Sequence, residues 1–249
     1  MRFLLLPLLL LTLLAAPVTA AWVDERSFGI FEFHAEFPLR DIEPLVVELG
    51  ELQKDIESTL DLKCSDRRIE VYLFSNRWSY QQYTRKNVPD GAGRQALYVA
   101  GNDAGRVYAY RHRDLDTDLR HETTHALLHN ALPYVPLWLD EGLAEYFEVP
   151  AGLRAEKQVR MRVLGGIVNR RIAPLSQLEA IRKLPDFTAN DYRDARCWIH
   201  FLLHGPPEAH AALEEFLATI PTGREPTPVS VGLQRRLPDL DARFQQHFR

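Results

Sequence analysis

The part of the sequence that most constrains the fold lies near the middle of the chain, where two apolar stretches carry histidines and acids on either side of two prolines. The first stretch, residues 116–132, contains the sequence H-E-T-T-H, with His121 and His125 at its ends. Histidines four residues apart share one face of a helix, so their rings can meet a single metal ion. Glu122 can then reach toward a water molecule beside that ion, as a general base requires.

The apolar surroundings of this motif favour a metal site over an ordinary polar helix face. Leucines and alanines flank the histidines, which predicts a helix that is at least half buried. Buried polar side chains need partners, because leaving them unpaired costs free energy. A metal ion would supply those partners, whereas an amphipathic helix with a solvated polar face remains the alternative.

The second stretch supplies a candidate third ligand. Pro133 and Pro136 force the chain to turn, so a helix at 139–147 can pack back against the first helix. Glu141 on this helix would complete the three protein ligands that a catalytic zinc ion usually takes. Glu145, one turn later, would orient a ligand histidine by accepting a hydrogen bond from its distal nitrogen. Its alternative is a solvated position.

These two stretches together resemble a known family. H-E-T-T-H followed by W-L-D-E-G-L-A-E-Y at 138–146 is similar to the gluzincin branch of zinc metallopeptidases, within the aminopeptidase-like superfamily, and to its small secreted members with an E-G-L-A-E-Y-F block. The resemblance implies a zincin-like fold, one Zn²⁺ per chain and hydrolysis of a peptide or protein substrate, with Glu122 as the base. The spacer is short and a G-x-M-E-N signature is absent, so aminopeptidase activity is not implied.

A peptidase of this kind also needs a group that stabilises the developing oxyanion. The resemblance favours Tyr192, expected at the start of a helix, over a purely packing role for that tyrosine. The strand expected at 106–111 resembles the zincin edge strand, along which an extended substrate adds as a further strand. An internal strand of a hairpin is the alternative for this segment.

Hydrophobic periodicity predicts an α+β fold with two subdomains. Residues 21–149 would form a zincin-like part, with a mixed sheet and the active-site helix, and residues 150–249 a mainly helical part. The expected strands are one within 22–37 and then 69–74, 95–100 and 106–111. The other expected helices are 41–62, 77–86, 153–168, 192–203, 208–220 and a final polar helix.

Residues 1–20 have the features of a secretory signal peptide: a basic start, an apolar run and small residues before the cleavage site. The expected location is therefore secreted or periplasmic, with an uncleaved membrane anchor as the alternative. No later segment has the length or hydropathy of a membrane span. The formal net charge of −4 is mixed along the chain, which argues against nucleic-acid binding.

For several side chains the sequence allows either a functional or a structural role. Cys64 and Cys197 form either one disulfide or two separate buried thiols. His129 continues the histidine ladder but is expected to face solvent. His200 and His204 are expected to be structural and not a second metal site. The rival functions are an inactive zincin-fold protein that binds peptides or a partner, a hydrolase of non-peptide amides or esters, and a structural protein; the oligomeric state is undetermined.

Overall fold

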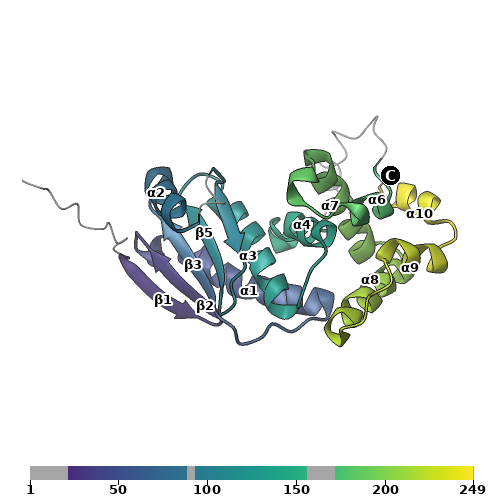
Figure 1. Cartoon of the computed structure of the whole chain (residues 1–249), viewed down its shortest axis with the longest axis horizontal. Helices are drawn as coiled ribbons and strands as arrows, with labels where there is room; N and C mark the ends of the chain where they lie inside the picture. Colours follow the sequence, from purple (N-terminus) through teal and green to yellow (C-terminus); the bar gives the residue numbers. More distant parts are fainter. Residues whose placement is uncertain (1–21, 89–92, 156–171, 249) are drawn as a thin grey trace, which may run out of the picture.

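The chain folds into a mixed sheet followed by helices, as Figure 1 shows. The computed structural model describes residues 22–88, 93–155 and 172–248. The expected α+β class, with a mixed sheet in the first half and helices in the second, is confirmed. The expected signal peptide and most of the helix predicted at 153–168 lie outside the described residues.

Five strands form one sheet in the order β1-β2-β3-β5-β4. The three central strands are parallel to one another, while β1 and β4 run antiparallel at the two edges. The strands are β1 (Asp24–Phe28), β2 (Phe31–Ala35), β3 (Ile69–Phe74), β4 (Ala96–Val99) and β5 (Gly105–Tyr110).

Two expectations about these strands are wrong. The single strand predicted within 22–37 is a hairpin, because Gly29 turns the chain with a φ of 59°, a conformation that residues with a Cβ rarely adopt. The strand predicted at 106–111 is β5, which lies between β3 and β4, so it is the internal hairpin strand that the sequence left as the alternative and not the edge strand. The edge strand next to β5 in the sheet is β4, so a substrate strand that added to this edge would pair with residues 96–99.

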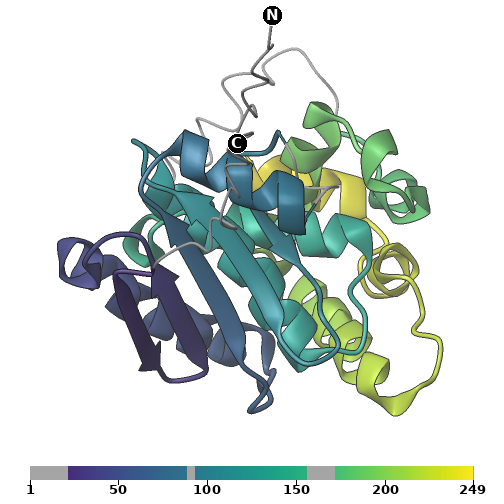
Figure 2. The same cartoon turned by 60° about the vertical axis from the view of Figure 1, so that its left-hand side comes forward.

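The two faces of the sheet are covered by different helices, as Figure 2 shows. Side chains alternate along each strand, so Val71 and Val107 face the main core while Tyr72 and Tyr108 face the other side. On that second side lies α2 (Arg77–Asn87), which is capped at its start by the Asn76 side chain. The main core contains α1 (Glu43–Leu60) and α3 (Leu115–Ala131).

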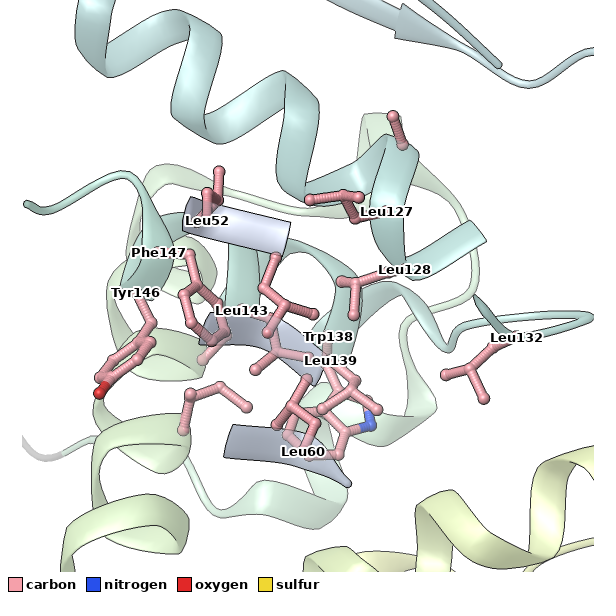
Figure 3. Close-up of a cluster of buried hydrophobic side chains, with 14 of the residues drawn as sticks. Leu52, Leu60, Leu127, Leu128, Leu132, Trp138, Leu139, Leu143, Tyr146 and Phe147 are labelled. Atoms are coloured by element: carbon pink, nitrogen blue, oxygen red, sulfur yellow. The ribbon is translucent and has the colours of Figure 1, made fainter. Parts of the chain in front are cut away.

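The main core holds α3 against the next helix, α4 (Leu137–Phe147). Figure 3 shows side chains of α1, of the C-terminal part of α3 and of α4 meeting in one apolar cluster. Within it Trp138 is 2 % exposed and Leu139 and Leu143 are fully buried. Burial of side chains of this size contributes about 1.5–3 kcal/mol each, so this packing fixes the crossing of α3 and α4.

The remaining elements form the helical second half. The helix α7 packs closely on α4 and starts with a capping box made by Thr188 and Asp191. The single polar helix expected at the end is two short helices. The helices are α6 (Leu175–Ala180), α7 (Ala189–His204), α8 (Pro207–Thr219), α9 (Val229–Arg236) and α10 (Leu240–His247), with 3-10 turns at Leu39–Ile42, Ala151–Leu153, Leu184–Asp186 and Ile220–Thr222.

Among the described residues, no helix combines the length and hydropathy that crossing a membrane requires.

Replacing Gly142 by alanine is expected to lower the free energy of unfolding by about 1 kcal/mol. The added methyl group would lie 2.8 Å from Cγ1 of Ile199 and 3.2 Å from Cβ of Ala195, so α7 would have to shift. This overpacking should exceed the gain in helix propensity, which is about 1 kcal/mol. Urea denaturation measures the change. Gly152→Ala is the control, since a methyl group there meets nothing within 4 Å; equal stability of both variants would contradict the expectation.

Candidate metal centre

The helix α3 places His121 and His125 on one face. Leu119 and Leu127 anchor its other sides and Leu128 lies one turn beyond the histidines, and all three leucines are fully buried. The expected burial of the motif is therefore confirmed. The two imidazole rings lie 4.9 Å apart between centroids and are nearly perpendicular, at 77°.

Glu141 reaches both histidines from α4. One of its oxygens, Oε2, lies 3.7 Å from Nε2 of His121 and 3.6 Å from Nε2 of His125. Glu141 is only 6 % exposed, and burial alone would raise the pKa of its carboxyl group. The two histidines outweigh that effect and lower the pKa to about 2. The three side chains predicted as ligands are thus brought together, with their ligand atoms within 4.8 Å of one another.

The two distances from Glu141 to the histidine nitrogens are close to those around a tetrahedral metal ion. Zinc binds nitrogen and oxygen at about 2.0–2.1 Å, so neighbouring ligands in a tetrahedron lie about 3.3 Å apart. The observed separations of Glu141 from the two histidines need to close by only a few tenths of an ångström. Two imidazoles and one carboxylate are also a donor set that suits catalytic zinc. The residues present therefore could hold such an ion.

Two carboxylates orient the histidines, and neither is Glu145, so that assignment was wrong. Nδ1 of His125 lies 2.7 Å from Oδ1 of Asp140, and Nδ1 of His121 lies 3.0 Å from Oε2 of Glu148. Each contact leaves the Nε2 atom free to face Glu141. The sequence analysis missed Glu148; its spacing of seven residues from Glu141, two helical turns, is a signal that could have identified it.

His129 contacts Asp140, the carboxylate that orients His125, whereas the sequence analysis expected His129 to face solvent. Its Nε2 lies 2.9 Å from Oδ2 of Asp140, the oxygen that His125 does not use. The charges and hydrogen bonds of the two histidines lower the pKa of Asp140 well below its usual range, although burial acts in the opposite direction. Asp140 therefore stays ionised and links the ligand face of α3 to its C-terminal turn.

Glu145 lies beside the site and faces Arg196 of α7, 3.8 Å away. Burial, and then the charge of Glu148, raise the pKa of Glu145 to about 6. Arg196 also lies 3.9 Å from Glu148, so α7 supplies a positive charge next to the carboxylate that orients His121. Sequence reasoning did not single out Arg196, because no local pattern connects it with α4.

Glu122 points toward a cavity of about 430 Å³. Burial raises the pKa of its carboxyl group, while the charges of His125 and His121 oppose that effect. The backbone N–H of Tyr98, on the edge strand β4, also interacts with this carboxylate. The cavity is lined by Arg94, Gln95, Ala96, Asp118, His121, Glu122 and Glu148.

Tyr192 lies in the first turn of α7, as expected, and packs edge-on against Phe187. Burial and then the negative charge of Glu141 raise the pKa of its hydroxyl group to about 12, with smaller effects from Glu145 and Glu122. Tyr192 therefore lies close enough to the site for the charges of its carboxylates to act on the hydroxyl group, which stays protonated near neutral pH. Its ability to stabilise an oxyanion remains a prediction.

The disulfide considered from the sequence is not formed. Cys64 and Cys197 are both free and buried. The Cys64 thiol contacts the backbone oxygen of Leu127 at 3.7 Å, while Cys197 lies within α7. Burial raises the pKa of each thiol to about 12, so both stay protonated and poorly reactive near neutral pH.

His200 and His204 take part in hydrogen bonds within the helical half. Nδ1 of His200 lies 2.8 Å from Nε2 of His247, and Nε2 of His204 lies 2.8 Å from the hydroxyl oxygen of Tyr146. Within residues 22–88, 93–155 and 172–248, the groups able to hold a metal do not include either histidine. The structural interpretation of this pair is therefore favoured.

Replacing Asp140 by asparagine is expected to weaken zinc binding about 10- to 100-fold. The amide keeps the shape of the side chain but removes the charge that holds His125 in the correct tautomer. Competition with a chelating dye measures the affinity. Glu25→Gln is a matched control, because Glu25 makes the same kind of contact, 2.7 Å, with Nδ1 of His34, and neither residue belongs to the groups that could hold a metal. Equal affinities for the two variants would rule out the orienting role.

Zinc binding is expected to release protons at neutral pH. In the metal-free protein, Glu141 and Glu148 raise the pKa of His121 to about 9 against the effect of burial, and Asp140 likewise raises the pKa of His125. Both rings must be neutral to bind a metal, so affinity should rise about tenfold or more per unit between pH 6.5 and 8.5. Calorimetry at pH 7 in two buffers of different ionisation enthalpy counts the protons. Release of none would show that the histidines are already neutral.

No model of a protein family matches the chain, and no curated protein is significantly similar to it.

Proposed function

We propose that the protein is a secreted or periplasmic zinc-dependent metallohydrolase of gluzincin type, and that it acts as a peptidase. The observation that carries the proposal is the position of Glu122. Its carboxylate lines the same cavity as His121, while His121, His125 and Glu141 bring three ligand atoms together beside it. A metal site that served only structure would need no acid at this position.

Each side chain then has a role in amide hydrolysis. A zinc ion held by the three ligands would polarise the scissile carbonyl group and lower the pKa of a water molecule. Glu122 accepts the proton of the attacking water and passes it to the leaving amine. Its raised pKa suits this task, because a carboxyl group that takes up and returns a proton works best when its pKa approaches the working pH.

Two further elements support a peptide as substrate. The edge strand β4 is paired on one side with β5, and among the described strands no other pairs with it. An extended peptide can add to such an edge through main-chain hydrogen bonds, close to Glu122. Tyr192, protonated and within range of the site carboxylates, can donate a hydrogen bond to the oxyanion as it forms.

The test is digestion of a complex peptide mixture by the zinc-loaded mature chain, with new termini identified by mass spectrometry. Cleavage that is lost after chelation and restored by zinc would support the peptidase. Parallel assays with ester and non-peptide amide probes separate the broader hydrolase. A fully zinc-loaded protein that cleaves none of these would instead favour a protein that binds peptides or a partner.

A further inference from the structure

The cavity beside Glu122 contains a cation that the proposed mechanism does not use. Arg94 lines this cavity together with Glu122 and His121. Among the described residues of its lining, Arg94 is the one arginine or lysine. Its positive charge acts on both Glu122 and Tyr192, opposing the larger effect of burial on their pKa values. Arg94 is therefore within electrostatic range of the residues proposed to perform the reaction.

Two of the acidic residues that line the cavity with Arg94 interact with other side chains. Asp118 lies 2.9 Å from His112, and Glu148 contacts both His121 and Arg196. In the described part of the chain, no carboxylate lies within ion-pair distance of Arg94. An exposed arginine without a partner is ordinary on a protein surface, so the location of this one in the cavity is what distinguishes it.

The position of Arg94 along the chain indicates what it would meet. It lies two residues before β4, the edge strand on which an extended substrate would add. A substrate bound along β4 would therefore lie near both the guanidinium group of Arg94 and the carboxylate of Glu122. A guanidinium group presents paired N–H donors that match the two oxygens of a carboxylate.

We propose that Arg94 binds a carboxylate of the substrate close to the scissile bond, so that the protein selects peptides that present a carboxylate at this position. The carboxylate is either the C-terminal group or the side chain of an aspartate or glutamate. This inference rests on the proposed peptidase function. It adds a substrate class to a site whose own lining carries three carboxylates and would otherwise repel an acidic substrate.

The first experiment compares hydrolysis by the zinc-loaded wild type, Arg94→Gln and Arg85→Gln. Arg85 is an exposed arginine of α2 outside the cavity, so it is the matched control. The best-cleaved peptide is resynthesised with its C-terminus amidated, or with its acidic side chains replaced by amides. One of these changes should lower kcat/KM about tenfold in the wild type and Arg85→Gln but not in Arg94→Gln. The change that does so identifies the source of the carboxylate.

The second experiment measures binding, so that the two proposals can fail separately. Peptides are selected from the same mixture on the zinc-loaded Glu122→Gln protein, with and without Arg94→Gln. Enrichment of peptides with acidic side chains, or a loss of binding when the C-termini of the mixture are amidated, supports the subsite if it disappears with Arg94→Gln, even if the wild type cleaves nothing and the peptidase proposal falls. No such enrichment, or an equal effect of neutralisation on wild type and Arg94→Gln, overturns the subsite.

Discussion

Glu122→Gln is expected to lower the rate of peptide hydrolysis about a thousandfold and to leave zinc bound. Glutamine keeps the size and polarity of the side chain but cannot take a proton from water, and general-base catalysis contributes about 10²- to 10⁴-fold. Glu122 does not belong to the group His121, His125 and Glu141, so the metal affinity should change little. Single-turnover hydrolysis and zinc content are measured on the same preparation.

The matched control for this variant is Glu51→Gln. Glu51 is an exposed residue of α1 whose only described ion pair is with Lys54, so the same substitution there should leave activity unchanged. Full activity of Glu122→Gln with zinc bound would remove Glu122 from the mechanism. Loss of zinc from that variant would show instead that the substitution disturbs the ligands, and the base would then be tested with Glu122→Asp.

Glu141→Ala is expected to weaken zinc binding by more than about 100-fold, since removal of a ligand should exceed the 10- to 100-fold cost of removing an orienting group. The variant leaves two histidines without the oxygen that faces both of them. Zinc per chain after dialysis, and competition with a chelating dye, measure the loss. Circular dichroism confirms that α4 still folds.

Glu145→Ala is the matched control, and it also decides between two arrangements. His121, Glu145 and Glu148 form a second group whose ligand atoms lie within 4.8 Å of one another. In that group Glu148 already contacts Nδ1 of His121, and the positive charge of Arg196 beside Glu145 and Glu148 disfavours a second cation there. Zinc should therefore remain in Glu145→Ala. Zinc loss there with retention in Glu141→Ala would place the metal at the second group instead.

The predicted ligands could be found from the sequence because their geometry is local. A spacing of four residues places His121 and His125 on one helical face wherever that helix lies in the fold. Pro133 and Pro136 break the first helix and turn the chain, so the helix carrying Glu141 was able to pack back against it. The α+β class followed in the same way from hydrophobic periodicity, and the structure confirms it.

The partners of these ligands depend on how α4 crosses α3, which no local pattern contains. Asp140 and Glu145 lie on α4 and Glu148 directly follows it, and from sequence Glu145 had the most suggestive spacing. The apolar cluster around Trp138 sets the angle at which α4 crosses α3. At this angle Asp140 contacts His125, and Glu148 contacts His121.

The sequence by itself determined the metal-ligand motif and the alternation of strands and helices, because both arise from the period of the backbone. The tertiary structure alone decided the order of the strands, the separation of the two cysteines as free thiols, and the place of Arg94 in the cavity. Each of these depends on contacts between residues far apart in the chain, whose positions are fixed by packing of the whole core and not by their neighbours in sequence.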